Sequence, residues 1–71
     1  MMEPDRLVIS LLARPGRHDR RTIAARTRLS RPVLHQTLRK LTRMGWITGD
    51  DAGYRLTPSG LRTAKSLRGA S

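Results

Sequence analysis

The sequence predicts a mainly α-helical domain that carries one small β-hairpin. Apolar residues recur three and four positions apart over most of the chain, which is the spacing of one face of a helix. Between residues 46 and 56, β-branched and aromatic residues flank a cluster of Gly and Asp, which is typical of two strands joined by a turn. The chain shows no internal repeat, linker or low-complexity run, so we expect a single domain over residues 1–71.

The first two predicted helices span residues 4–13 and 20–26. Pro4 is tolerated in the first turn of a helix, and the run Arg14-Pro15-Gly16 ends that helix because Pro disfavours a helical residue before it. Asp19 is the predicted N-cap of the second helix. The side chains that these helices are expected to bury are Leu7, Val8, Leu11, Leu12, Ile23 and Ala24.

The third predicted helix spans residues 31–44 and has the clearest start and stop signals. Ser30 can cap its first turn, and Gly45 can adopt the left-handed conformation that ends it. Its Leu residues recur at helical spacing and must face a core, which leaves a basic and hydrogen-bonding side turned to water. The buried positions are Leu34, Leu38 and Leu41.

Two short strands and a fourth helix complete the prediction. The strands span residues 46–48 and 54–56, on either side of the Gly and Asp cluster. The fourth helix spans residues 58–68, with Thr57 as its cap and Pro58 at its first position. It is expected to bury Leu61, Ala64 and Leu67.

The charge of the chain indicates a polyanionic partner. Fifteen Lys and Arg residues against five Asp and Glu give a formal net charge of +10 at pH 7. Nucleic acid is the obvious partner for such an excess, and Arg suits bidentate contacts to phosphate and guanine.

Other classes of protein are disfavoured by composition. The longest apolar stretch, residues 7–13, is far shorter than the ~20 residues of a membrane span, and Glu3 and Asp5 stand where a secretory leader would be positive. The absence of Cys excludes a disulfide, a thiolate metal site and a thiol nucleophile. We therefore expect a cytoplasmic protein with no membrane association.

Three segments carry a resemblance to a known family: Thr22 to Ser30, Leu38 to Ile47, and Tyr54 to Gly60. With the predicted order of elements, they resemble the winged helix-turn-helix of bacterial regulators of the MarR, PadR and ArsR type. The resemblance implies that helix 31–44 is a recognition helix, which enters the major groove while the preceding helix crosses the backbone. It also implies a cytoplasmic, nucleoid-associated transcriptional regulator.

The same resemblance implies which residues contact double-stranded DNA. Gln36 suits a bidentate contact to adenine, and Arg31 or Arg39 suits one to guanine or phosphate. The residues that match groove-facing positions of the family are Arg31, Pro32, Val33, His35, Gln36 and Arg39. Those expected to contact phosphates are Arg20, Arg21, Thr22, Lys40 and Arg43, together with Arg55 on a wing strand.

Two positions depart from the family pattern. Arg28 stands where the turn often has a Gly, and at positive φ it would cost roughly 1 kcal/mol of local strain. The wing tip, usually basic, carries Asp50 and Asp51. Because carboxylates repel phosphate, we do not expect this tip to enter the minor groove, and only Arg55 on the wing is suitably charged.

We expect no enzyme activity, no cofactor and no metal site. Ser30 and Ser59 stand at helix starts and Asp19 at a cap, so no catalytic triad is indicated. No Gly-rich phosphate loop follows a strand. We expect His35 to form hydrogen bonds in a groove and His18 to be exposed in a loop.

The sequence therefore predicts a small, sequence-specific protein that binds double-stranded DNA and regulates transcription. One alternative has the same chemistry, namely a replication or excision accessory of a plasmid or phage. Another belongs to a different class, a protein-interaction or RNA-binding module of the same fold. We expect no small-molecule effector, since the chain lacks the extra helices that form ligand pockets in these families. If a homodimer forms, its interface is expected to be helices 4–13 and 58–68, through their Leu-rich stripes.

Overall fold

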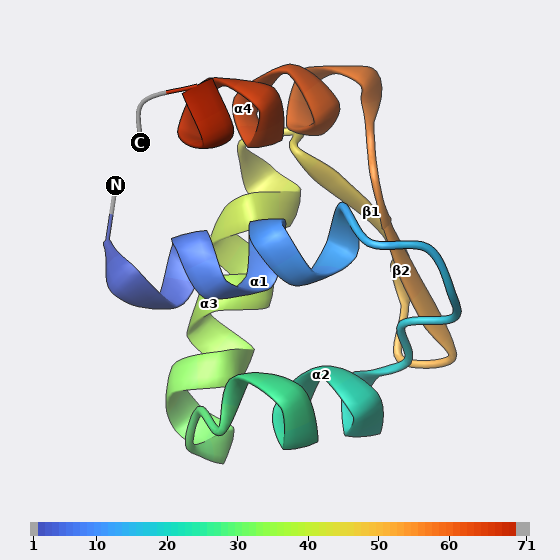
Figure 1. Cartoon of the computed structure of the whole chain (residues 1–71). Coiled ribbons are helices and arrows are strands. Elements are labelled where there is room, and N and C mark those ends of the chain that lie inside the picture. Colours follow the sequence, from blue (N-terminus) through green and yellow to red (C-terminus); the bar gives the residue numbers. More distant parts are fainter. Residues whose placement is uncertain (1, 70–71) are drawn as a thin grey trace.

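A computed structural model of the protein describes residues 2–69 (Figure 1). The predicted fold class is confirmed, since four helices accompany one antiparallel hairpin, and the helix bounds differ from the predicted ones by one residue at most. None of the helices in residues 2–69 has the length and apolar character needed to cross a membrane. The elements are α1 (Glu3–Leu12), α2 (Arg20–Thr27), α3 (Arg31–Arg43), β1 (Ile47–Asp50), β2 (Gly53–Leu56) and α4 (Pro58–Gly69).

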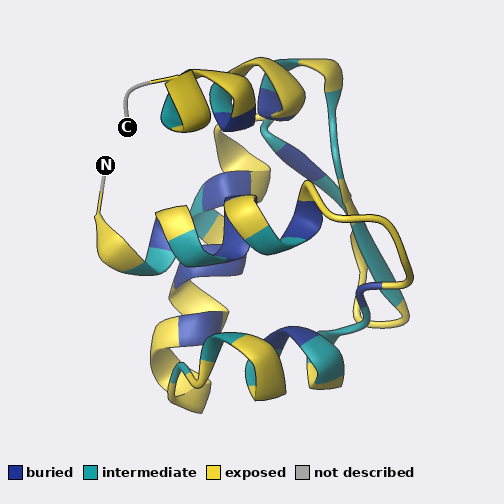
Figure 2. Ribbon diagram, viewed as in Figure 1, coloured by how far each residue is buried: buried dark blue, intermediate teal, exposed yellow. Residues whose placement is uncertain are grey.

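Helix α1 lies at the centre of the arrangement. In Figure 1, α4 lies above it, α2 lies below it and α3 crosses behind it, while the hairpin stands to one side. The buried segments lie where these elements face one another (Figure 2). The apolar core is formed by Val8, Ile9, Leu12, Ile23, Leu34, Leu38, Leu41, Ile47 and Ala64.

Helices α2 and α3 begin at their predicted caps, and one strained residue lies in the turn between them. The Asp19 carboxylate accepts a hydrogen bond from the Thr22 N–H at 2.7 Å, and the Ser30 hydroxyl accepts one from the Val33 N–H at 3.4 Å. Each satisfies a donor that the start of a helix leaves unpaired. Arg28 has a φ of 59°, so the left-handed conformation considered for this position is present, and about 1 kcal/mol of strain accompanies it.

The hairpin is longer than predicted. Both strands extend inward beyond the predicted ranges 46–48 and 54–56, so that only residues 51 and 52 form the turn. The difference arises because Gly49, placed in the turn by its residue type, is a strand residue with a φ of 120°, and a side chain there would collide with the Gly53 carbonyl oxygen. The paired residues are Ile47 with Leu56, Thr48 with Arg55, Gly49 with Tyr54 and Asp50 with Gly53.

Helix α4 is attached to the end of α3 through backbone contacts. Gly45 has a φ of 78°, which is the left-handed conformation predicted for it. The Trp46 carbonyl accepts a hydrogen bond from the Thr57 N–H at 3.0 Å, while the Thr57 hydroxyl oxygen accepts one from the Gly60 N–H at 3.1 Å, as expected of a cap. The first turn of α4 therefore lies directly on the chain that leaves α3, at Gly60.

This contact predicts opposite effects of Ala at the two glycines of α4. A Cβ at Gly60 would overlap the Trp46 carbonyl, whereas a Cβ at Gly69 meets nothing within 4 Å. We expect Gly60→Ala to lower the free energy of unfolding by about 1–3 kcal/mol through overpacking. Gly69→Ala should be neutral or slightly stabilising, because Ala has the higher helix propensity. Thermal and urea unfolding followed by circular dichroism measures both, and equal stability of the two variants would contradict the close contact.

Candidate nucleic-acid interface

Helix α3 presents an exposed face without an acidic side chain. Its Leu34, Thr37, Leu38 and Leu41 are buried, which turns the opposite side to solvent. The helix itself contains no Asp or Glu, so cations and hydrogen-bonding groups are not interrupted by carboxylates. The predicted DNA contacts of α3 that are exposed are Arg31, Pro32, Val33, His35, Gln36, Arg39 and Arg43.

A groove separates this helix from the hairpin. It has a volume of about 1100 Å³ and is lined by α3 on one side and by the tip of the hairpin on the other. Of the predicted contacts, the fold brings four together here: Arg20, His35, Arg39 and Arg43. Leu38, Thr42 and Tyr54 also line the groove, and sequence reasoning did not assign them to the site.

The tip of the hairpin is fastened to the start of α2. The Asp51 carbonyl accepts a hydrogen bond from the Arg20 N–H at 2.9 Å, and the Asp51 carboxylate lies 3.5 Å from the Arg20 guanidinium. The Tyr54 hydroxyl donates to the same carboxylate at 3.0 Å. An exposed ion pair alone contributes little, but backbone and side-chain contacts on one residue together fix the position of the tip. We call Arg20, Asp51 and Tyr54 the wing latch.

The two aspartates of the tip therefore have structural partners. Asp51 belongs to the wing latch, and the Asp50 carboxylate accepts a hydrogen bond from the Ala52 N–H at 3.0 Å within the turn. Their predicted position at the tip is confirmed. The sequence shows two acids in a turn, but it does not show that one of them meets a residue of α2.

Two ionisable groups around the site have displaced pKa values. Burial raises the pKa of Tyr54, and its hydrogen bond to the Asp51 carboxylate raises it further. Hydrogen bonds from the Thr22 side chain and N–H lower the pKa of Asp19. At neutral pH, Tyr54 is consequently a hydrogen-bond donor and Asp19 is an ionised cap.

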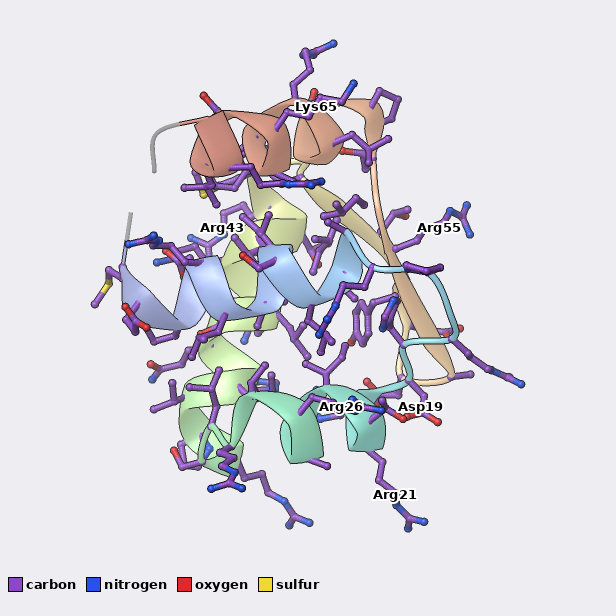
Figure 3. The ribbon with its side chains drawn as sticks, in the orientation of Figure 1. Asp19, Arg21, Arg26, Arg43, Arg55 and Lys65 are labelled. Carbon is purple, nitrogen blue, oxygen red and sulfur yellow. The ribbon has the colours of Figure 1, made fainter. Side chains whose placement is uncertain are left out.

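The remaining predicted contacts lie outside the groove. Arg21 is exposed and extends away from the body of the protein on α2 (Figure 3). The Thr22 N–H donates a hydrogen bond to the Asp19 carboxylate, which caps α2. Arg55 is exposed and points away from the hairpin.

Lys40 differs from the sequence-based expectation. Its Nζ lies 2.8 Å from the carboxylate of Asp5, a residue of α1 that is 4% exposed. Lys40 follows the buried Thr37 by three positions, so it lies on the flank of α3 that faces the first turn of α1. The resemblance assigned Lys40 to a phosphate, whereas in the structure its ammonium group pairs with the Asp5 carboxylate.

His18 was expected to be exposed, and this expectation is wrong. The residue is 8% exposed, and its Nε2 lies 2.8 Å from the Arg14 carbonyl oxygen. The His18 carbonyl accepts a hydrogen bond from the Tyr54 N–H at 2.9 Å, so β2 covers the segment before α2. A contact between residues so far apart in sequence leaves no local pattern. In residues 2–69, no three His, Asp or Glu side chains are grouped as metal ligands.

Comparison with known proteins identifies a family. The chain belongs to the family described as the HVO_A0261 N-terminal domain, whose model matches residues 3–70. No curated protein matches the chain, and no solved structure does.

The Lys40 contact predicts a loss of stability. Lys40→Ala leaves the buried Asp5 carboxylate without its cation, so we expect the free energy of unfolding to fall by about 1–3 kcal/mol. Arg39→Ala removes an exposed cation from the position before Lys40, and it should change the free energy of unfolding by no more than about 0.5 kcal/mol. Urea unfolding of both variants makes the comparison. Similar values would show that the Asp5 carboxylate does not depend on Lys40.

The wing latch predicts how the single tyrosine titrates. Asp51→Asn should lower the pKa of Tyr54 part of the way toward its ordinary value of 10.0, because burial remains while the carboxylate is lost. Asp50→Asn should leave that pKa unchanged. In the unaltered chain the raised pKa means that the neutral hydroxyl stabilises the fold fully below about pH 10, and that this contribution is lost as the pH rises through the folded pKa. Absorbance of tyrosinate measures the titration, and identical curves for the two variants would contradict the latch.

Proposed function

We propose that this protein binds double-stranded DNA and that it reads sequence in the major groove with α3. The observation that carries the proposal is the exposed face of α3, on which cations and hydrogen-bonding side chains occur without a single acid. The formal net charge of +10 supports the same conclusion. A helix about 10–12 Å across with its side chains matches the major groove, which is about 12 Å wide.

The positions of individual side chains suggest two tasks. Gln36 is exposed in the middle of α3, where it can form a bidentate contact to adenine. Arg21 is exposed on α2, the helix that crosses the phosphate backbone in helix-turn-helix proteins. We therefore assign base reading to Gln36 and its neighbours His35 and Arg39, and backbone contact to Arg21.

The wing contributes mainly through one cation in this proposal. Arg55 is the only Lys or Arg in residues 47–56 and is exposed, which suits contact with a phosphate. The tip presents Asp50 and Asp51, and insertion of these carboxylates into the minor groove would be repulsive.

Regulation of transcription is the role that we infer, because three segments of the chain resemble the winged helix-turn-helix of MarR, PadR and ArsR regulators. This implies a cytoplasmic, nucleoid-associated protein. A plasmid or phage accessory protein would use the same interface. Dimerisation through α1 and α4 remains a prediction, and it would favour an inverted repeat with half-sites about one helical turn apart.

The proposal predicts different consequences for Gln36 and Arg21. After a preferred site has been selected from random duplexes, Gln36→Ala should weaken binding to it by about 1–3 kcal/mol and relax the choice at one base pair. Arg21→Ala should weaken binding to all duplexes and reduce the salt dependence by about one ion. For the unaltered protein, about five phosphate contacts give a log–log slope of affinity against salt near −4 to −5. Fluorescence anisotropy over a series of salt concentrations measures each quantity.

Lys65→Ala is the matched control, because Lys65 is exposed on α4 at the opposite end of the molecule from α2 (Figure 3). It should leave base preference unchanged. If Gln36→Ala preserved base preference while Arg21→Ala altered it, the assigned reading face would be wrong. Equal affinity for a duplex RNA of similar length would reject DNA as the specific partner.

A further inference from the structure

Helix α1 carries two leucines that the fold buries only in part, and one of them, Leu11, packs against the edge of the core. Val8, Ile9 and Leu12 are buried against the other elements. Leu7 and Leu11, four positions apart and therefore on one side of the helix, are only half-buried. The residues that surround Leu7 and Leu11 on the surface come from α1, α2 and α4 and the segment after α1, and none of them belongs to α3, the proposed reading helix.

A groove forms on this side of the molecule. It has a volume of about 670 Å³, and its apolar part includes Leu7 and Leu11 of α1 and Ala64 of α4. We call it the α1 groove.

The cations that line the α1 groove come from three separate segments. Arg14 follows α1, Arg26 belongs to α2 and Arg68 belongs to α4. None of the described residues that line the groove is acidic, in contrast to the groove between α3 and the hairpin, which contains Asp50 and Asp51. The α1 groove thus combines an apolar floor with a rim of a single charge.

We propose that the α1 groove is a docking site for an acidic amphipathic helix of another protein. Leu-like side chains along one side of such a helix would cover Leu7 and Leu11, which removes apolar surface from water. Asp and Glu beside that stripe would face Arg14 and Arg26, which favours the correct partner and speeds association.

The charge of the rim decides between this occupant and two others. A second copy of the chain, as in the dimer expected through α1 and α4, would bring the same arginine-lined patch to both sides of a two-fold interface, so the charge of the rim disfavours that dimer at this groove. Nucleic acid would suit the cations, but the apolar floor of Leu7, Leu11 and Ala64 offers no aromatic ring on which a base could stack. An acidic amphipathic helix offers apolar side chains to the floor and carboxylates to the arginines of the rim.

The probe is a synthetic peptide of about 16 residues with Leu at positions i, i+3, i+4 and i+7 of a helix and Glu at most others. Binding to the full chain is measured by fluorescence anisotropy. Arg26→Glu should weaken binding at least tenfold, and Arg14→Glu should do the same. Arg21→Glu is the matched control on α2, because Arg21 extends away from the body and does not line the groove. It should weaken binding no more than about twofold.

Peptide controls separate this mode from general attraction to a basic protein. A scrambled peptide of the same composition, which has no apolar stripe, should bind at least tenfold more weakly, and a Lys analogue should not bind. In NMR spectra, the peptide should shift the methyl signals of Leu7 and Leu11 and leave the amide of Gln36 unchanged. Thermal unfolding of each variant establishes that it is folded at the temperature of the measurement.

Several results would overturn the proposal. These are an equal loss of affinity in Arg26→Glu and Arg21→Glu, equal binding of the scrambled peptide, or absence of peptide binding. If sedimentation showed that the free chain is a dimer and that Arg26→Glu dissociates it, the occupant of the groove would be a second copy of the chain. If duplex DNA shifted the NMR signals of Leu7 and Leu11 rather than those of α3, the occupant would be nucleic acid. Because the α1 groove and α3 are tested by different variants, this proposal and the DNA proposal can fail separately.

Discussion

The structure depends on the burial of α1. In residues 2–69 the elements pack around one small core, and α1 supplies side chains that the other elements share. It contacts α2, α3, α4 and β2. Val8 and Ile9 are completely buried, so the apolar sides of the surrounding helices turn inward toward α1. The exposed face of α3 follows from this arrangement, because the buried Leu side of α3 and its basic side are opposite sides of one helix.

Polar contacts then decide how the peripheral elements are oriented. The ion pair between Lys40 and Asp5 joins α3 to the first turn of α1, and the wing latch joins the hairpin to α2. In both, an acidic residue of a strongly basic protein holds a cation within the fold. Few acids are present, and these two are structural. The charge available to a polyanion is therefore mainly that of the exposed arginines, with exposed Lys65 in addition.

The two proposed partners use different properties of the molecule. A DNA interface on α3 would depend on exposed cations and on polar side chains that reach base edges. The α1 groove combines half-buried leucines with arginines, and it would recognise the apolar stripe and the acidic side chains of a partner helix. The two proposals therefore place DNA and a protein helix on separate surfaces of one molecule.

The sequence by itself determined the elements and the direction in which α3 faces. Asp19, Ser30 and Gly45 act locally, within a few residues of the helix ends that they form, so their pattern could be read without a structure. The spacing of the Leu residues likewise fixed the buried and exposed sides of α3. Each of these inferences needs only residue type and short-range geometry.

Only the tertiary structure decided which distant residues meet. The family resemblance assigned Lys40 to a phosphate, and its partner Asp5 lies on another helix. His18 is buried because β2 reaches its carbonyl, and Asp51 faces Arg20 because the hairpin folds back onto α2. The physical reason is the same in each case: periodicity and capping report the path of the chain over a few residues, whereas ion pairs and burial depend on how whole elements pack.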